Sequence, residues 1–181
     1  MVRIDFSHLR FLIVDDNVHM RRIVRTLLNG FGVRDIYEAD NGATGLDAFN
    51  QFGPDIIITD WAMPGFDGIE LTQMIRQPEG NSNPYVAIIM MTGHTEKHRV
   101  TAARDAGVTE ILVKPISAKA LHARIVNIVV NPRDFIKTET YFGPDRRRNI
   151  NVNYAGPERR KNGRAQVLRQ NALSDKPRLS A

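Results

Sequence analysis

The sequence of 181 residues contains no cysteine. Disulfide bonds, thiolate metal sites and a cysteine nucleophile are therefore excluded. The sequence also lacks an apolar run long enough to cross a membrane, and its first residues do not show the basic and then apolar pattern of a signal segment. We therefore expect a cytoplasmic protein without membrane insertion.

Acidic and large apolar residues are both sparse near the C-terminal end of the chain. Residues 1–131 have 13 Lys and Arg against 15 Asp and Glu, a net charge of −2, whereas residues 132–181 have 12 against 5, a net charge of +7. Residues 132–181 are also rich in Pro, Asn, Arg and Gly, and such a composition rarely supplies enough apolar surface for a hydrophobic core. We predict one domain over residues 1–131, followed by a basic, largely irregular and flexible extension over residues 132–181.

The first 131 residues alternate short apolar runs with amphipathic segments. The apolar runs predict strands at 10–14, 35–39, 56–59, 86–91 and 110–113. The amphipathic segments predict helices at 17–29, 42–51, 68–76, 95–106 and 117–130. Because the strands are too far apart for hairpins, this pattern predicts an α/β fold, a doubly wound five-stranded parallel sheet with helices on both faces.

Polar side chains follow several of the predicted strands. Asp15 and Asp16 follow the first strand, and Asp60 follows the third. Ligands of open α/β sheets bind outside the carboxyl ends of the strands, and three converging carboxylates are costly unless a hard cation such as Mg²⁺ joins them. The fourth strand ends near Thr92, a hydroxyl, and the fifth ends near Lys114, an ammonium. This set indicates phosphoryl transfer onto Asp60.

Four stretches carry a family resemblance: LIVDDNVHMRRIVRTLL, IITDWAMPGFDGIEL, MMTG and VKP. Together they resemble the CheY-like receiver domain of bacterial two-component response regulators, over about residues 8–131. The resemblance implies a flavodoxin-like (CheY-like) fold and a cis peptide between Lys114 and Pro115. It also implies a set of site residues: Asp60 as phosphoacceptor, Asp15, Asp16, Asp60 and the main-chain carbonyl of Ala62 as Mg²⁺ ligands, and Thr92 and Lys114 as phosphoryl contacts.

One position departs from the pattern of the family. Many receivers carry Tyr or Phe three residues before the lysine, and this sequence has Ile111 there. An aromatic side chain that switches rotamer together with Thr92 is therefore not expected in this protein.

The resemblance implies a stand-alone response regulator rather than an enzyme with a separate substrate. It would accept a phosphoryl group on Asp60 from a histidine kinase or phosphotransfer protein, and then signal by binding an output protein. A Mg²⁺-dependent phosphatase of the haloacid dehalogenase type is an alternative. Those enzymes carry Asp-x-Asp after the first strand, whereas Asp15 and Asp16 are adjacent.

The extension contains a repeated motif. Residues 141–148 read YFGPDRRR and residues 154–161 read YAGPERRK, thirteen positions apart. Arginine side chains bind phosphates and stack on bases, and tyrosine adds a stacking surface. The target is left open between an acidic protein surface (the receiver's own included), nucleic acid, and a phosphorylated small molecule such as cyclic di-GMP, which some CheY-like proteins with Arg-rich extensions bind. The candidate phosphate-binding residues are Arg146, Arg147, Arg148, Arg159 and Arg160.

Overall fold

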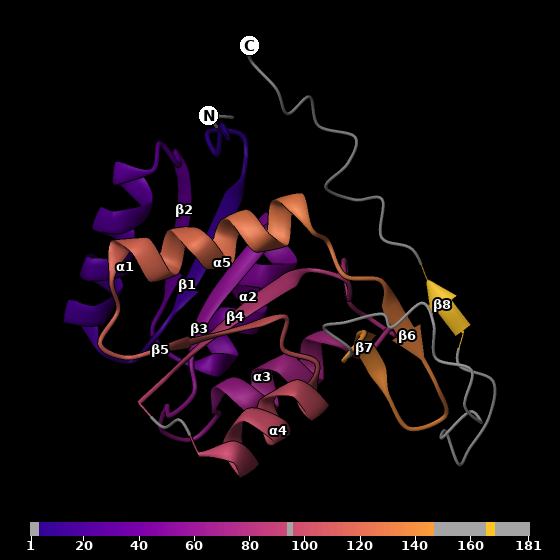
Figure 1. The fold of residues 1–181 in the computed structure, drawn as a ribbon. Coiled ribbons are helices and arrows are strands. Elements are labelled where there is room, and N and C mark those ends of the chain that lie inside the picture. The colour runs from indigo at the N-terminus through magenta and orange to yellow at the C-terminus, as the bar shows by residue number, and fades with distance from the viewer. Residues whose placement is uncertain (1–3, 94–95, 147–165, 169–181) are drawn as a thin grey trace.

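A computed structural model describes residues 4–93, 96–146 and 166–168 of the chain. Its main sheet has five parallel strands in the order β2-β1-β3-β4-β5 (Figure 1). The strands are β1 Arg10–Val14, β2 Asp35–Ala39, β3 Ile56–Asp60, β4 Ala87–Thr92 and β5 Glu110–Val113. The predicted doubly wound parallel sheet is therefore confirmed.

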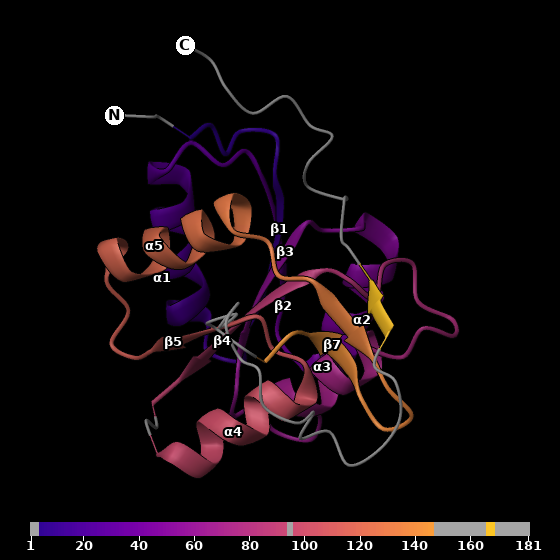
Figure 2. The ribbon, with the colours of Figure 1, turned by 45° about the vertical axis from the view of Figure 1, so that its right-hand side comes forward.

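Five helices cover the two faces of this sheet. They are α1 Val18–Gly30, α2 Gly42–Phe52, α3 Gly68–Ile75, α4 Lys97–Ala106 and α5 Ala118–Val130. Helices α1 and α5 pack on one face, and α2 and α3 pack on the other, with α4 beside α3 (Figures 1 and 2). Within the described ranges, every helix is too short or too polar to traverse a bilayer.

The central strand β3 lies between β1 and β4, and all five of its residues are buried. A strand buried on both faces needs a continuous apolar run, which the sequence supplies in Ile56, Ile57 and Ile58. In the register of the sheet, Val14 is the partner of Thr59, and Asp60 is the partner of Met91. The carboxyl ends of β1, β3 and β4 therefore meet at one edge, directly before the loops that lead into α1, α3 and α4.

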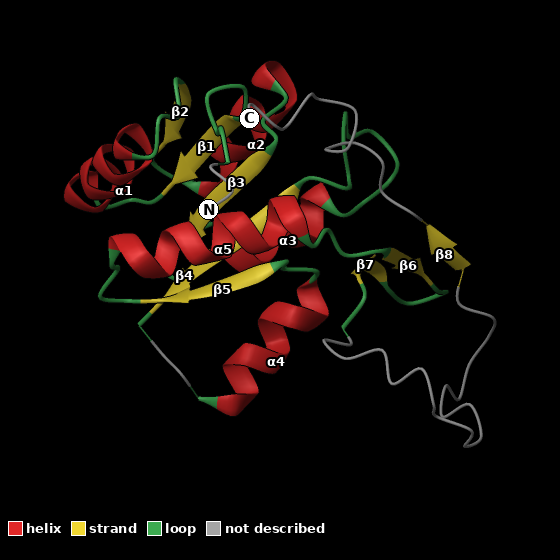
Figure 3. Ribbon diagram, turned by 45° about the horizontal axis from the view of Figure 1, so that its top comes forward, coloured by secondary structure: helices red, strands yellow, loops and turns green. Residues whose placement is uncertain are grey.

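The described part of the extension forms a second, small sheet that the sequence analysis did not predict. Strands β6 Phe135–Lys137, β7 Phe142–Pro144 and β8 Gln166–Leu168 pair antiparallel in the order β7-β6-β8 (Figure 3). This sheet lies at the opposite end of the molecule from Asp60, because its contacts reach residues at the amino ends of β4 and β5.

Three aromatic rings explain why these strands form despite the polar composition. Phe135 is only 2% exposed, and its ring lies 5.1 Å from that of Tyr85 and 5.6 Å from that of Phe142. The guanidinium of Arg76 lies 5.1 Å from the centre of the Phe135 ring. The extension has too few apolar residues for a core of its own, but Tyr85 and Arg76 of the preceding domain complete one.

Two ion pairs add to this contact. Arg133 lies 3.3 Å from Glu110, whose buried carboxylate also binds Arg124 and Asn127 of α5. Arg146 lies 3.0 Å from Asp105 of α4. The first copy of the repeated motif thus contacts one carboxylate of α4.

Helix α5 ends at Val130, and the predicted domain boundary after residue 131 stays a prediction. Of the five candidate phosphate-binding arginines, only Arg146 is described. The other four lie outside the described residues: Arg147, Arg148, Arg159 and Arg160.

Candidate functional site

Asp60 is the last residue of β3, and one oxygen of its carboxylate makes both a hydrogen bond and an ion pair. Oδ1 accepts a hydrogen bond of 2.8 Å from the main-chain N–H of Trp61 and lies 2.9 Å from Nζ of Lys114. The backbone N–H of Lys114 donates to the carbonyl oxygen of Thr92 at 2.8 Å, which fixes the start of the loop after β5 against β4. The two contacts that the structure shows for this carboxylate therefore both go to Oδ1.

Asp15 follows β1 and is completely buried. Its Oδ1 accepts a hydrogen bond of 2.8 Å from the backbone N–H of Asn17, whereas its buried Oδ2 has no hydrogen-bond partner. Nζ of Lys114 lies 3.6 Å from this Oδ2. Burial raises the pKa of Asp15, the negative charges of Asp60 and Asp16 raise it further, and the Asn17 N–H and Lys114 only partly oppose this.

Three carboxylates converge at this edge, as the sequence predicted. Oxygens of Asp15, Asp16 and Asp60 all lie within 4.8 Å of one another. Asp16 is exposed to solvent, while Asp15 and Asp60 are buried. An all-oxygen set with an unsatisfied buried oxygen and one open side suits a hard divalent cation that keeps some of its water. These residues therefore fit the metal site that the receiver resemblance implies.

The remaining predicted site residues lie at the same edge. Thr92 is the last residue of β4, 2% exposed, and is paired with Val113, the residue before Lys114. The peptide bond between Lys114 and Pro115 is cis, as expected. Ile111 packs, partly buried, against a small apolar cluster between α4 and the sheet. Ala62 is exposed in the loop after β3, and the role of its carbonyl stays a prediction.

Two residues that the sequence analysis did not single out shape this site. Asn17 caps α1, since its side chain accepts from the N–H groups of His19 and Met20, and its own N–H holds Asp15. An Asn directly before an amphipathic run is a capping signal that could have revealed it. Gly68, the first residue of α3, donates its N–H to the carbonyl oxygen of Trp61 at 3.0 Å and closes the loop after Asp60. No sequence signal pointed to that closure.

The geometry agrees with the comparisons of this chain with known proteins. The family model of the response regulator receiver domain matches residues 11–126. The chain belongs to this family. It is a CheY-like signalling protein of two-component systems, not a conventional enzyme, and the matched range stops before the extension.

Chemotaxis proteins are among the relatives of this receiver. It is 36% identical over 122 residues to the chemotaxis protein CheY-3 of Vibrio cholerae, a match that covers 67% of this chain and 92% of the relative. It is 36% identical over 120 residues to the chemotaxis protein CheY of Pseudomonas aeruginosa, covering 66% of this chain and 95% of the relative.

Solved receiver structures share the fold. The match to CheY4 of Vibrio cholerae has a TM-score of 0.61 with 26% identity, and covers 66% of this chain and 98% of that one. A second match has a TM-score of 0.60 with 25% identity, and covers 67% of this chain and 89% of that one. It is the receiver domain of Ssk1 from Saccharomyces cerevisiae, crystallised with the histidine phosphotransfer protein Ypd1. A receiver domain implies a phosphodonor kinase or a phosphotransfer partner.

Proposed function

We propose that the protein accepts a phosphoryl group on Asp60 from the phosphohistidine of a kinase or phosphotransfer protein in the cytoplasm, and then signals by binding an output protein. The observation that carries the proposal is the position of Lys114, whose Nζ lies 2.9 Å from Oδ1 of Asp60 and 3.6 Å from Oδ2 of Asp15. The Lys114 ammonium lies between two carboxylates at the carboxyl edge of a parallel sheet, where it can bind an additional anionic group.

The chemistry follows from the two oxygens of Asp60. Oδ1 is engaged by Lys114 and by the N–H of Trp61, so Oδ2 is the nucleophile. The new Oδ2–P bond forms as the P–N bond of the phosphohistidine breaks, and the bonding electron pair returns to the imidazole nitrogen. Hydrolysis of the resulting acyl phosphate by water restores the carboxylate and releases inorganic phosphate.

The neighbouring residues supply charge and donors for this step. Asp15, Asp16, Asp60 and the carbonyl of Ala62 would hold Mg²⁺, which when bound neutralises charge on the phosphoryl oxygens. Lys114 compensates the remaining negative charge, and the hydroxyl of Thr92 offers a hydrogen bond to a phosphoryl oxygen. Burial of Asp15 and Asp60 keeps bulk water from screening these interactions.

Phosphorylation by acetyl phosphate tests this proposal. With Mg²⁺, the protein should gain one acid-labile and hydroxylamine-sensitive phosphoryl group, measured by mass spectrometry, and Asp60→Asn should abolish it. Asp47→Asn is the matched control, because Asp47 is exposed on α2, away from the site. Normal rate and stoichiometry in Asp60→Asn would refute the assignment of the phosphoacceptor.

A ligand for the extension is a separate proposal. The guanidinium of Arg146 lies 3.9 Å from the centre of the Tyr141 ring and forms an ion pair with Asp105. Arg146 therefore already has two partners within the protein. Binding of cyclic di-GMP or nucleic acid would therefore depend on the arginines that follow Arg146 in the sequence.

A further inference from the structure

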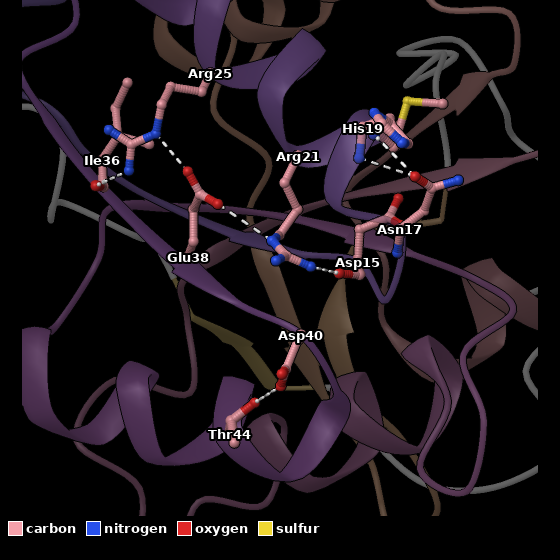
Figure 4. Close-up of polar contacts among 10 residues, drawn as sticks. Asp15, Asn17, His19, Arg21, Arg25, Ile36, Glu38, Asp40 and Thr44 are labelled. Atoms are coloured by element: carbon pink, nitrogen blue, oxygen red, sulfur yellow. Dashed lines mark hydrogen bonds and ion pairs between the residues drawn. The ribbon is translucent and has the colours of Figure 1, made fainter.

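Two arginines one turn apart on α1 share a single glutamate of β2 (Figure 4). Nε of Arg21 lies 3.1 Å from Oε2 of Glu38, and Nε of Arg25 binds Oε1 of the same carboxylate. The two arginines differ in what else they hold. Arg25 donates from Nη2 to the carbonyl oxygen of Ile36 at 3.0 Å, whereas Arg21 donates from Nη1 to the carbonyl oxygen of Asp15 at 2.7 Å.

This arrangement is partly buried and fully charged. The side chain of Arg21 is 16% exposed and that of Glu38 is 28% exposed. Burial alone would raise the pKa of Glu38, but hydrogen bonds and charge from Arg25 and Arg21 outweigh it and hold the pKa below its usual value. Ionised Glu38 therefore fixes the orientation of the Arg21 guanidinium and neutralises its charge beside the carboxylate site.

Arg21 completes the set of contacts around Asp15. The N–H of Asp15 donates to the carbonyl oxygen of Ala39 at 3.2 Å, its Oδ1 accepts from Asn17, and its carbonyl oxygen accepts from Arg21. The remaining polar atom is Oδ2, the buried oxygen without a hydrogen-bond partner. Holding the other three atoms fixes the direction of Oδ2, which lies 3.6 Å from Nζ of Lys114.

We propose that Arg21 is a positioning residue for the cation site. Its hydrogen bond to the carbonyl of Asp15, backed by Glu38, holds the peptide plane between Asp15 and Asp16, and thereby the direction of both carboxylates. Groups that orient metal ligands in this way influence metal affinity by about 10- to 100-fold in other proteins. The inference rests on the proposed role of the three carboxylates in binding Mg²⁺.

Arg25 provides a matched control for this role. It lies on the same helix and binds the same glutamate, but its second contact is the carbonyl of Ile36 rather than that of Asp15. Arg21→Met and Arg25→Met each remove one partner of Glu38 at similar side-chain volume. Only Arg21→Met removes the contact to the site.

Titration of the full-length protein with Mg²⁺, followed by the fluorescence of Trp61, measures the effect. Arg21→Met should raise the Kd for Mg²⁺ by about tenfold or more, Arg25→Met by less than about twofold, and Arg21→Lys should recover part of the affinity. The thermal midpoints of the two methionine variants, measured without Mg²⁺, should fall by similar amounts. Equal losses of affinity in both variants, or none in Arg21→Met, would overturn the proposal.

A measurement without metal separates this inference from the proposed function. In ¹⁵N-labelled, Mg²⁺-free protein, Arg21→Met should shift the amide resonances of Asp16 and Asn17 much more than Arg25→Met does. If these amides shift but the parent protein does not bind Mg²⁺, the carboxylate cluster is not a cation site. The proposed function is then wrong, although Arg21 does position the backbone of Asp15. If the parent binds Mg²⁺ and the amides of Arg21→Met stay in place, only the positioning role of Arg21 is wrong.

Discussion

Gly68 lies against the backbone of Asp60. A Cβ atom at Gly68 would lie 2.1 Å from the main-chain oxygen of Asp60, far inside any van der Waals contact. The hydrogen bond from the N–H of Gly68 to the carbonyl of Trp61 brings the two segments this close. The start of α3 and the backbone of Asp60 therefore form one tightly packed unit that tolerates no side chain at position 68.

The first prediction tests this contact. Gly68→Ala should force the main chain of Asp60 to move, which should cost about 1–3 kcal/mol of unfolding free energy and slow phosphorylation by acetyl phosphate. Urea unfolding and mass spectrometry measure the two effects. Gly30→Ala is the control, because no atom lies within 4 Å of the Cβ built there. Equal unfolding midpoints for Gly68→Ala and the parent would contradict the prediction.

The second prediction concerns Lys114. Lys114→Ala removes the cation between Asp15 and Asp60, so the remaining carboxylates should bind Mg²⁺ at least as tightly as in the parent. The rate of phosphorylation should nevertheless fall about tenfold or more, because the charge that stabilises the transferred group is missing. The exposed Lys119 on α5 supplies the control variant, Lys119→Ala. Loss of Mg²⁺ binding in Lys114→Ala, measured by Trp61 fluorescence, would show that the lysine has a different role.

The third prediction concerns pH. The hydrogen bonds and charges of Arg25 and Arg21 hold the pKa of Glu38 below its usual value in the folded protein, so the folded state favours the ionised form. This contribution to stability is present above the unfolded pKa and is lost as the pH falls through the folded pKa. Glu38→Gln should therefore lower the unfolding free energy by about 1–2 kcal/mol at pH 7 and by progressively less below about pH 4.5. Urea unfolding at pH values from 7 to 3.5 measures this difference in unfolding free energy between Glu38→Gln and the parent. A difference that stays constant over this range would refute the stabilising role of ionised Glu38.

The fourth prediction concerns the small sheet of the extension. Phe135→Ala removes the ring that packs on Tyr85, Phe142 and Arg76, and should cost about 3–5 kcal/mol if the sheet unfolds together with the receiver. Val167→Ala is the control, since Val167 of β8 is 53% exposed and its truncation should cost less than about 0.5 kcal/mol. Unchanged stability in Phe135→Ala would mean that the extension does not support the receiver.

The fifth prediction concerns the ligand of the extension. Truncation after Arg146 keeps the contacts with Tyr141 and Asp105 but removes the other four candidate arginines. It should leave phosphorylation of Asp60 intact and abolish any heat of binding to cyclic di-GMP or a short single-stranded oligonucleotide. Purely electrostatic binding should also weaken steeply with salt, because bound phosphates release counterions. If the full-length protein gives no heat with either ligand at moderate salt, the nucleotide proposal is wrong.

The sequence determined the main sheet and the edge at which its chemistry lies. Strands β2 and β5 begin and end where the apolar pattern predicts, at Asp35–Ala39 and Glu110–Val113. These signals are local, because apolar runs and helix caps are read within a few residues. The convergence of Asp15, Asp16 and Asp60 was also predictable, since parallel strands bring their carboxyl ends to one edge.

Tertiary structure alone decided the contacts between segments far apart in the sequence. Phe135 and Phe142 are too few to suggest a core, and their strands form around Tyr85, which lies about fifty residues earlier in the chain. In the sequence, Arg21 is one of three arginines between the apolar residues of α1, but the fold places Glu38 and the carbonyl of Asp15 within its reach. Residue patterns encode which face of an element is apolar, whereas the partner of a single polar group depends on how whole elements pack.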